Sequence, residues 1–110
     1  MTTYLHGDTI VEHWRKMTLA EQLGNIGGEI SRAGNAQGKD EKRFNNAVDR
    51  ALELFDLTLS DPRWKNRLWE IGRMREVFCD TVLGAYMYGD NLKSLVKYFD
   101  QFAFITHHSG

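Results

Sequence analysis

The sequence predicts an all-α protein, folded as an up-down antiparallel four-helix bundle with a short extra N-terminal helix. Apolar residues recur at helical spacing in successive segments, and no segment alternates as a strand would. Capping residues precede several of these segments, and the connections are short, which favours antiparallel neighbours. The four main helices are expected over residues 18–35, 40–60, 62–86 and 91–105.

A short helix is expected before these four. Thr9 and Glu12 have the spacing of a capping box, in which a hydroxyl and a carboxylate each bind a free backbone N–H. Thr18 and Glu21 form a second such box, at the start of the next helix. The chain is therefore interpreted as one domain over residues 1–110. Its ends are a short N-terminal helix and arm over residues 1–17 and a frayed tail over residues 106–110.

The segment over residues 40–60 has the clearest helical pattern, and Asp40 is a suitable N-cap for it. Its apolar residues fall within one arc of about 100°, the width of a core-facing stripe. They are Phe44, Val48, Ala51, Leu52, Phe55 and Leu59. In the next segment Asp61 is the predicted cap and Pro62 the first helical residue, where a missing N–H costs nothing. Its predicted stripe is Trp64, Leu68, Ile71, Phe78 and Val82.

Composition excludes several classes of protein. The 110 residues include 14 Lys and Arg against 15 Asp and Glu, a net charge of −1, which lacks the basic excess typical of sequence-independent nucleic-acid binding. The single cysteine, Cys79, cannot form an internal disulfide. No apolar run is long enough for a membrane span, and the first residues show no signal-peptide pattern. We therefore expect a cytoplasmic globular protein that does not enter a membrane.

Small residues gather on one side of the segment over residues 18–35. Each glycine within a helix costs roughly 0.5–1 kcal/mol relative to alanine, so these glycines require a compensation. The favoured interpretation is close packing of a neighbouring helix against Gly24, Gly27, Gly28 and Ser31. The alternatives are a ligand or nucleic-acid backbone that approaches closely, and a helix that kinks at Gly27 and Gly28.

Arg75 projects within the apolar arc of the segment over residues 62–86. A guanidinium that faces a core needs a partner, because an unpaired buried charge costs several kcal/mol. Asp56 and Glu29 flank the stripes of the two preceding helices, and either could pair with Arg75. A structural ion pair between helices is the favoured interpretation. An anion-binding or partner-binding role and a side chain that reaches out to solvent are the alternatives.

Several aromatic and apolar residues lie outside the predicted core arcs: Trp69, Tyr98, Phe104 and Ile105. A helix that is apolar on nearly every side is usually buried on several sides, which a monomer of this length achieves with difficulty. The sequence therefore predicts a homo-oligomer whose interface contains these four residues. Isolated surface aromatics and a different protein as partner are the alternatives.

Basic residues alternate with tryptophans near residues 63–75, and the candidate nucleic-acid contacts are Arg63, Lys65, Arg67 and Arg73. Acidic residues share this region, so ordinary helix-surface charge is the favoured interpretation. Carboxylates also pair along two helices, at Glu53, Asp56, Glu76 and Asp80. By helical angle most of these point to solvent, and a metal-dependent hydrolase site is the less favoured interpretation.

Residues 23–29, with Asn25, Ile26 and Glu29, are followed by a glycine-containing loop over residues 34–38 and by a helix with Phe44, Ala47 and Leu52. Over about 40 residues this resembles the small bacterial four-helix-bundle proteins that include ribosomal-RNA intervening-sequence proteins and diversity-generating-retroelement accessory proteins. The resemblance implies an oligomeric bundle. In the retroelement members it also implies a basic surface that binds nucleic acid and a reverse transcriptase. The net charge of −1 departs from that surface.

The leading hypothesis is a non-enzymatic, self-associating interaction or scaffold protein. The chain shows no recognisable catalytic motif, and no cofactor or metal is expected. The second hypothesis is a nucleic-acid-binding accessory protein that uses the four basic residues above. The third, from the paired carboxylates, is a metal-dependent hydrolase.

Overall fold

The computed structural model describes residues 10–88 together with Leu92, Leu95 and Phe99. After a helical turn over residues 10–14 come α2 (Leu19–Ala36), α3 (Glu41–Leu59), the 3₁₀ helix η1 (Pro62–Arg67) and α4 (Leu68–Tyr88). No residue within these limits lies in a strand, so the prediction of an all-α protein is confirmed for them. The predicted capping box at Thr9 and most of the predicted helix over residues 91–105 lie outside the described residues.

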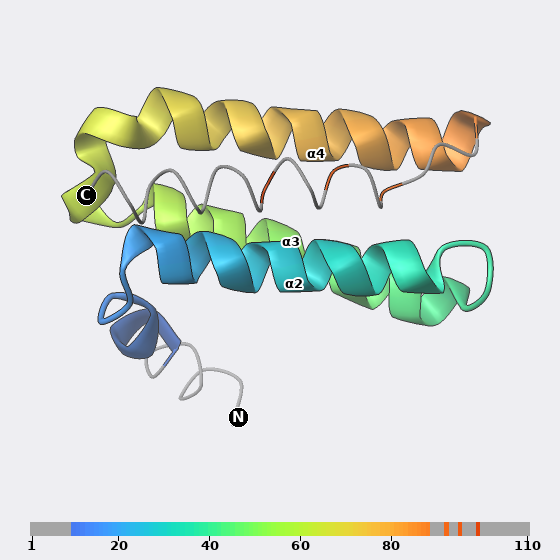
Figure 1. The fold of residues 1–110 in the computed structure, drawn as a ribbon, viewed down its shortest axis with the longest axis horizontal. Helices are drawn as coiled ribbons and strands as arrows, with labels where there is room; N and C mark the ends of the chain where they lie inside the picture. Colours follow the sequence, from blue (N-terminus) through green and yellow to red (C-terminus); the bar gives the residue numbers. More distant parts are fainter. Residues whose placement is uncertain (1–9, 89–91, 93–94, 96–98, 100–110) are drawn as a thin grey trace.

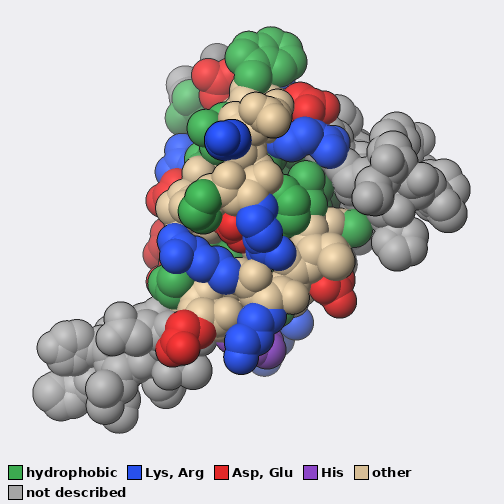
Figure 2. Space-filling model, turned by 90° about the vertical axis from the view of Figure 1, so that its left-hand side faces the viewer, with side chains coloured by type: hydrophobic (Ala, Val, Ile, Leu, Met, Phe, Trp, Pro, Cys, Tyr) green, Lys and Arg blue, Asp and Glu red, His purple; other side chains and the backbone are tan. Residues whose placement is uncertain are grey.

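Helix α3 lies beside α2 and beside α4, and it runs in the direction opposite to both (Figure 1). One end of the molecule contains the start of α2, the end of α3, and η1. Figure 2 views the molecule from that end, and Lys and Arg side chains are numerous on it. No helix in the described part of the chain is long and apolar enough to cross a membrane.

Local sequence accounts for the helix boundaries. Thr18 and Glu21 form the predicted capping box of α2, and the carboxylate of Asp40 accepts a hydrogen bond from the backbone N–H of Arg43 at the start of α3. The turn between α2 and α3 contains Gly38 with φ at +76°, a conformation that other residues adopt only with strain. These short-range signals place the two helices close to the predicted ranges.

The segment after Pro62 differs from the expected single helix over residues 62–86. Pro62 does begin a helix, but the first six residues are 3₁₀, and Trp64 departs from helical geometry at φ −104° and ψ 21°. The change of geometry alters the predicted stripe. Leu68 is 42% exposed, whereas Met74, which the stripe omitted, is fully buried.

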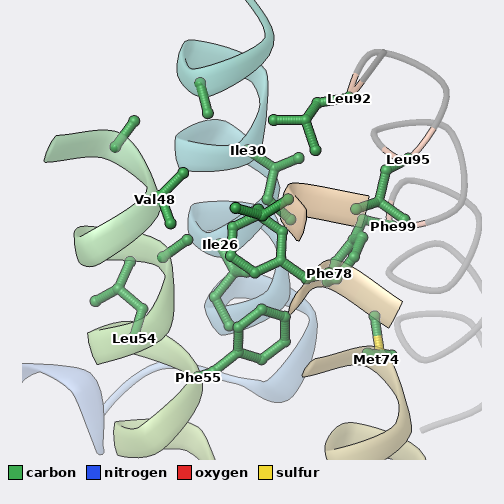
Figure 3. Packing of buried hydrophobic residues seen from close by; sticks show 14 of the residues in the cluster. Ile26, Ile30, Val48, Leu54, Phe55, Met74, Phe78, Leu92, Leu95 and Phe99 are labelled. Atoms are coloured by element: carbon green, nitrogen blue, oxygen red, sulfur yellow. The ribbon is translucent and has the colours of Figure 1, made fainter. Parts of the chain in front are cut away.

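The core lies between the three long helices and the residues described near the C-terminus (Figure 3). The fully buried ring of Phe55 in α3 has its centroid 5.8 Å from that of Phe78 in α4 and 5.6 Å from that of Phe99. Leu92 and Leu95 are also buried there. Residues of the three long helices thus form one apolar cluster with Leu92, Leu95 and Phe99, from which water is excluded.

The predicted close packing at the glycines of α2 is corrected in part. A Cβ added at Gly27 would lie 3.8 Å from the Cβ of Phe99, which is ordinary van der Waals contact. A Cβ at Gly24 or Gly28 would meet no atom within 4 Å in the described part of the chain, and Ser31 is half-buried. The helix continues from Leu19 to Ala36 without a break, so these glycines do not end it.

Candidate functional site

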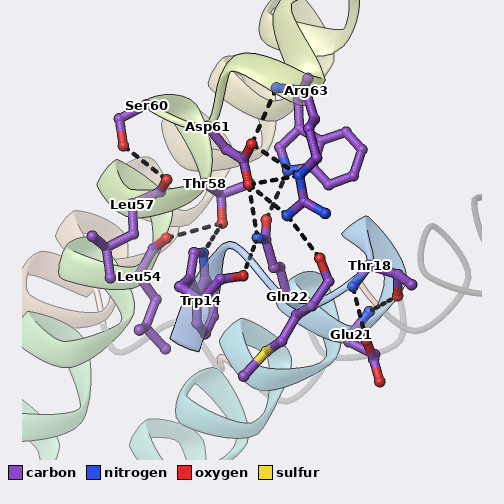
Figure 4. A network of polar contacts seen from close by, with 12 residues as sticks. Trp14, Thr18, Glu21, Gln22, Leu54, Leu57, Thr58, Ser60, Asp61 and Arg63 are labelled. Carbon is purple, nitrogen blue, oxygen red and sulfur yellow. Dashed lines mark hydrogen bonds and ion pairs between the residues drawn. The ribbon is translucent and has the colours of Figure 1, made fainter. Parts of the chain in front are cut away.

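A buried polar network joins four segments, the N-terminal turn, α2, α3 and η1, at the end of the molecule where η1 lies (Figure 4). The indole N–H of Trp14 donates to Thr58 Oγ1 at 3.0 Å, and Thr58 in turn donates to the backbone carbonyl of Leu54. The amide nitrogen of Gln22 donates to the backbone carbonyl of Trp14 at 2.8 Å, and its oxygen accepts the indole N–H of Trp64 at 2.8 Å. Gln22 therefore ties the N-terminal turn to η1 from the first turns of α2.

Asp61 is the charged centre of this network. Its side chain is 1% exposed, and Arg63 binds it through Nε at 3.1 Å and Nη2 at 2.7 Å. The backbone N–H of Arg63 and the amide nitrogen of Gln22 donate to the same carboxylate. The hydrogen bond from the Arg63 side chain, opposed by burial and assisted by the other donors, lowers the pKa of Asp61 to about 2. The same ion pair raises the pKa of Arg63.

Arg63 also forms a hydrogen bond to the segment that precedes α2. Its Nη2 donates to the backbone carbonyl of Met17 at 2.8 Å, and its Cζ lies 4.4 Å from the centroid of the Trp64 ring. In the described part of the chain, every buried side-chain nitrogen and oxygen has a hydrogen-bond partner. The network therefore fastens the N-terminal turn, α2, α3 and η1 to one another, and its buried polar atoms form hydrogen bonds among themselves.

Sequence reasoning missed this network. Asp61 was predicted only as a cap and Arg63 only as a nucleic-acid contact. One residue could have indicated the network from the sequence. Gln22 lies directly before Leu23 on the buried side of α2, and a buried amide requires hydrogen-bond partners.

The four predicted nucleic-acid contacts differ in their surroundings. Arg63 is engaged with Asp61, and Arg67 pairs with Glu70 at 3.0 Å. Lys65 and Arg73 are exposed, and neither forms an ion pair with another described residue. One of the four predicted contacts, Arg63, therefore has a structural role. The end face in Figure 2 shows Asp and Glu as well as Lys and Arg side chains.

The predicted ion pair of Arg75 forms with Asp56, whose Oδ1 lies 3.1 Å from Arg75 Nε. The Arg75 side chain is 35% exposed, so the expectation that it faces the core is corrected, and Met74 lies in the core beside it. Glu29 does not pair with Arg75, because it pairs with Arg32 of its own helix at 2.6 Å.

The paired carboxylates do not form a common site. Glu53 pairs with Arg50, and Asp56 pairs with Arg75. Among the described residues, no three His, Cys, Asp or Glu side chains are grouped closely enough to hold a metal ion. Four carboxylates converging on one metal, as the hydrolase hypothesis requires, are not found there.

A groove of about 800 Å³ follows α2 and α3, with four cationic side chains in its wall. Arg32 pairs with Glu29, Arg43 lies 3.6 Å from Asp40, and Arg50 pairs with Glu53. Each of these arginines is paired with an acidic residue three positions away in the sequence, which weakens the attraction that the groove exerts on an anion.

The outer face of α4 exposes large apolar residues. Trp69 is 80% exposed and Leu83 is 56% exposed, on the side of α4 away from Phe78. Beside Leu83, a hollow of about 250 Å³ opens between α3 and α4. Of the four predicted interface residues, Trp69 is therefore exposed, and Tyr98, Phe104 and Ile105 lie outside the described residues.

No family model, curated protein or solved structure matches this chain. The resemblance to the small bacterial four-helix-bundle proteins stays a prediction.

Proposed function

We propose that this chain is a non-enzymatic interaction protein, an up-down four-helix bundle with residues 91–105 as its fourth helix, and that it acts by self-association. The observation that carries the proposal is the outer face of α4. Its inner face already contributes Ile71, Met74 and Phe78 to the core, yet Trp69 and Leu83 remain open to water on the opposite side.

Because Trp69 and Leu83 are exposed, a partner that covers them would gain free energy from burying apolar surface. Fully burying a large apolar side chain contributes roughly 1.5–3 kcal/mol relative to leaving it exposed. A second protein surface over α4 would recover that contribution at Trp69 and add to it at Leu83. Tryptophan is also one of the residue types most often found at the energetic centre of protein interfaces.

The test is the molar mass of the purified full chain, measured by light scattering during size-exclusion chromatography at several protein concentrations. We expect an oligomer that persists at high salt, because apolar burial is not screened by ions. Trp69→Ala should reduce the mass towards that of the monomer, and Lys42→Ala, a change at an exposed residue of α3, should leave the mass unchanged. A monomer at every concentration would contradict self-association.

A nucleic-acid-binding accessory protein is the second candidate, favoured by the Lys and Arg side chains on the end face in Figure 2. Lys65 and Arg73 are the residues to test, because Arg63 is needed by the polar network. Fluorescence anisotropy with labelled single-stranded RNA and DNA should then show affinity that falls with salt and is lost in the Lys65→Glu/Arg73→Glu variant. Retained binding in that variant would exclude these two residues as the contacts.

A further inference from the structure

We propose that the self-association is a two-fold dimer in which α4 of one copy packs antiparallel against α4 of a second copy. This inference rests on the proposed function and specifies its partner, its register and its central contacts.

The contact residues form a regular seam along α4. Trp69, Gly72, Glu76, Cys79 and Leu83 follow one another at intervals of three, four, three and four residues. This spacing places residues on one face of a helix, as in the seam of two packed helices. All five are exposed or half-buried, so the seam is open along its whole length.

Two exposed apolar side chains lie at opposite ends of this seam. Trp69 projects near the start of α4 and Leu83 near its end. They are 14 residues apart, about 21 Å along the helix. Antiparallel packing about a two-fold axis near Glu76 brings Trp69 of each copy to Leu83 of the other. A parallel pair would instead place Trp69 against Trp69 and Leu83 against Leu83.

Gly72 allows the two helices to approach. A Cβ at this position would meet no atom within 4 Å in the described part of the chain, so packing within one copy does not require a glycine. Glycine within a helix costs about 1 kcal/mol relative to alanine. A second helix crossing at Gly72 and the small Cys79 would provide the compensation, because the absence of a side chain lets the backbones come closer.

Charge complementarity favours the same arrangement. Arg73 and Asp80 lie on the same flank of the seam, on either side of its midpoint at Glu76. Neither forms an ion pair with another described residue. A two-fold axis near Glu76 brings Arg73 of each copy to Asp80 of the other, which makes two equivalent ion pairs. The two Glu76 carboxylates then lie close together and repel each other.

The experiment uses charge reversal in the full chain, with dissociation measured by analytical ultracentrifugation. Arg73→Asp and Asp80→Arg should each weaken the dimer by about tenfold or more, because each places like charges opposite one another. The two variants mixed in equal amounts should form a heterodimer, since all the opposed charges are then of opposite sign. Gly72→Leu should dissociate the dimer, whereas Lys42→Ala should not. Glu76→Gln should strengthen it.

The outcomes separate this inference from the proposed function. Recovery of a dimer on mixing the two single variants supports antiparallel α4 packing, because a folding defect in either variant would not be repaired by mixing. A dimer that tolerates both charge reversals and Gly72→Leu would overturn the α4 arrangement while self-association stood. A wild-type chain that stays monomeric would overturn both. A weaker dimer in Glu76→Gln would overturn the placement of the axis.

Discussion

Trp14 donates its indole N–H to the hydroxyl of Thr58 at 3.0 Å, across 44 positions of the chain. The bond is buried, with Trp14 4% exposed and Thr58 fully buried. It fastens the turn before α2 to the last turn of α3, at the end of the molecule where η1 begins.

Breaking this bond from either side should destabilise the fold. Thr58→Val leaves the Trp14 N–H buried without an acceptor, which costs about 1–3 kcal/mol. Trp14→Phe removes the donor and part of the core, and should cost at least as much. Urea unfolding measures both. The double variant should be less destabilised than the sum of the two, since no unsatisfied donor remains, and strict additivity would show that the bond contributes nothing.

Acid should weaken the protein through Asp61. The folded state holds the pKa of Asp61 at about 2, below its ordinary value of 3.8, so the unfolded chain binds the proton more readily. The resulting contribution, about 2 kcal/mol, is present above pH 4 and is lost as the pH falls towards 2. Unfolding free energies measured across this range should show the loss in the wild type and a smaller loss in Asp61→Asn. An equal slope in the two proteins would contradict this assignment.

Arg63 and Lys65 are neighbours in η1 but should respond differently to truncation. Arg63→Ala leaves the buried Asp61 carboxylate without its main partner and should cost about 2–3 kcal/mol. Lys65 is exposed, so Lys65→Ala should change stability by less than about 0.5 kcal/mol. Thermal unfolding of the two variants provides the comparison. Similar melting temperatures for both would show that Arg63 is a surface residue without a structural role.

Two glycines should respond to alanine in opposite directions. Gly28 lies within α2 with open space at its Cβ position, so Gly28→Ala should stabilise the protein by about 0.5–1 kcal/mol through helix propensity. Gly38 has φ at +76°, so Gly38→Ala should destabilise it by about 1 kcal/mol. Chemical denaturation of both variants tests the pair. A destabilised Gly28→Ala would indicate that this face of α2 is covered by another element.

Short-range patterns in the sequence were sufficient to predict α2 and α3 closely. The capping box at Thr18 and the cap at Asp40 act through residues two or three positions away, so their effect is contained in the local sequence. The spacing of Ile71, Phe78 and Val82 likewise predicted which side of α4 faces the core. The sequence also predicted the Arg75–Asp56 pair as one of two possibilities. A cation close to an apolar arc has few acidic residues near it, and Asp56 was one of them.

The tertiary structure decided the features that depend on residues far apart in the chain. The sequence did not indicate that Gln22 contacts Trp14, Trp64 and Asp61 together, because each contact depends on how α2 crosses the other segments. The 3₁₀ helix after Pro62, with its departure from helical geometry at Trp64, was missed for a related reason, because several local conformations were available. The pairing of Glu29 with Arg32 was missed because Glu29 had several possible partners. Capping and periodicity act over one or two turns, so nearby residues were enough to predict where α2 and α3 begin. Only packing decided which polar side chains are buried together, because that depends on the free energy of the whole assembled core.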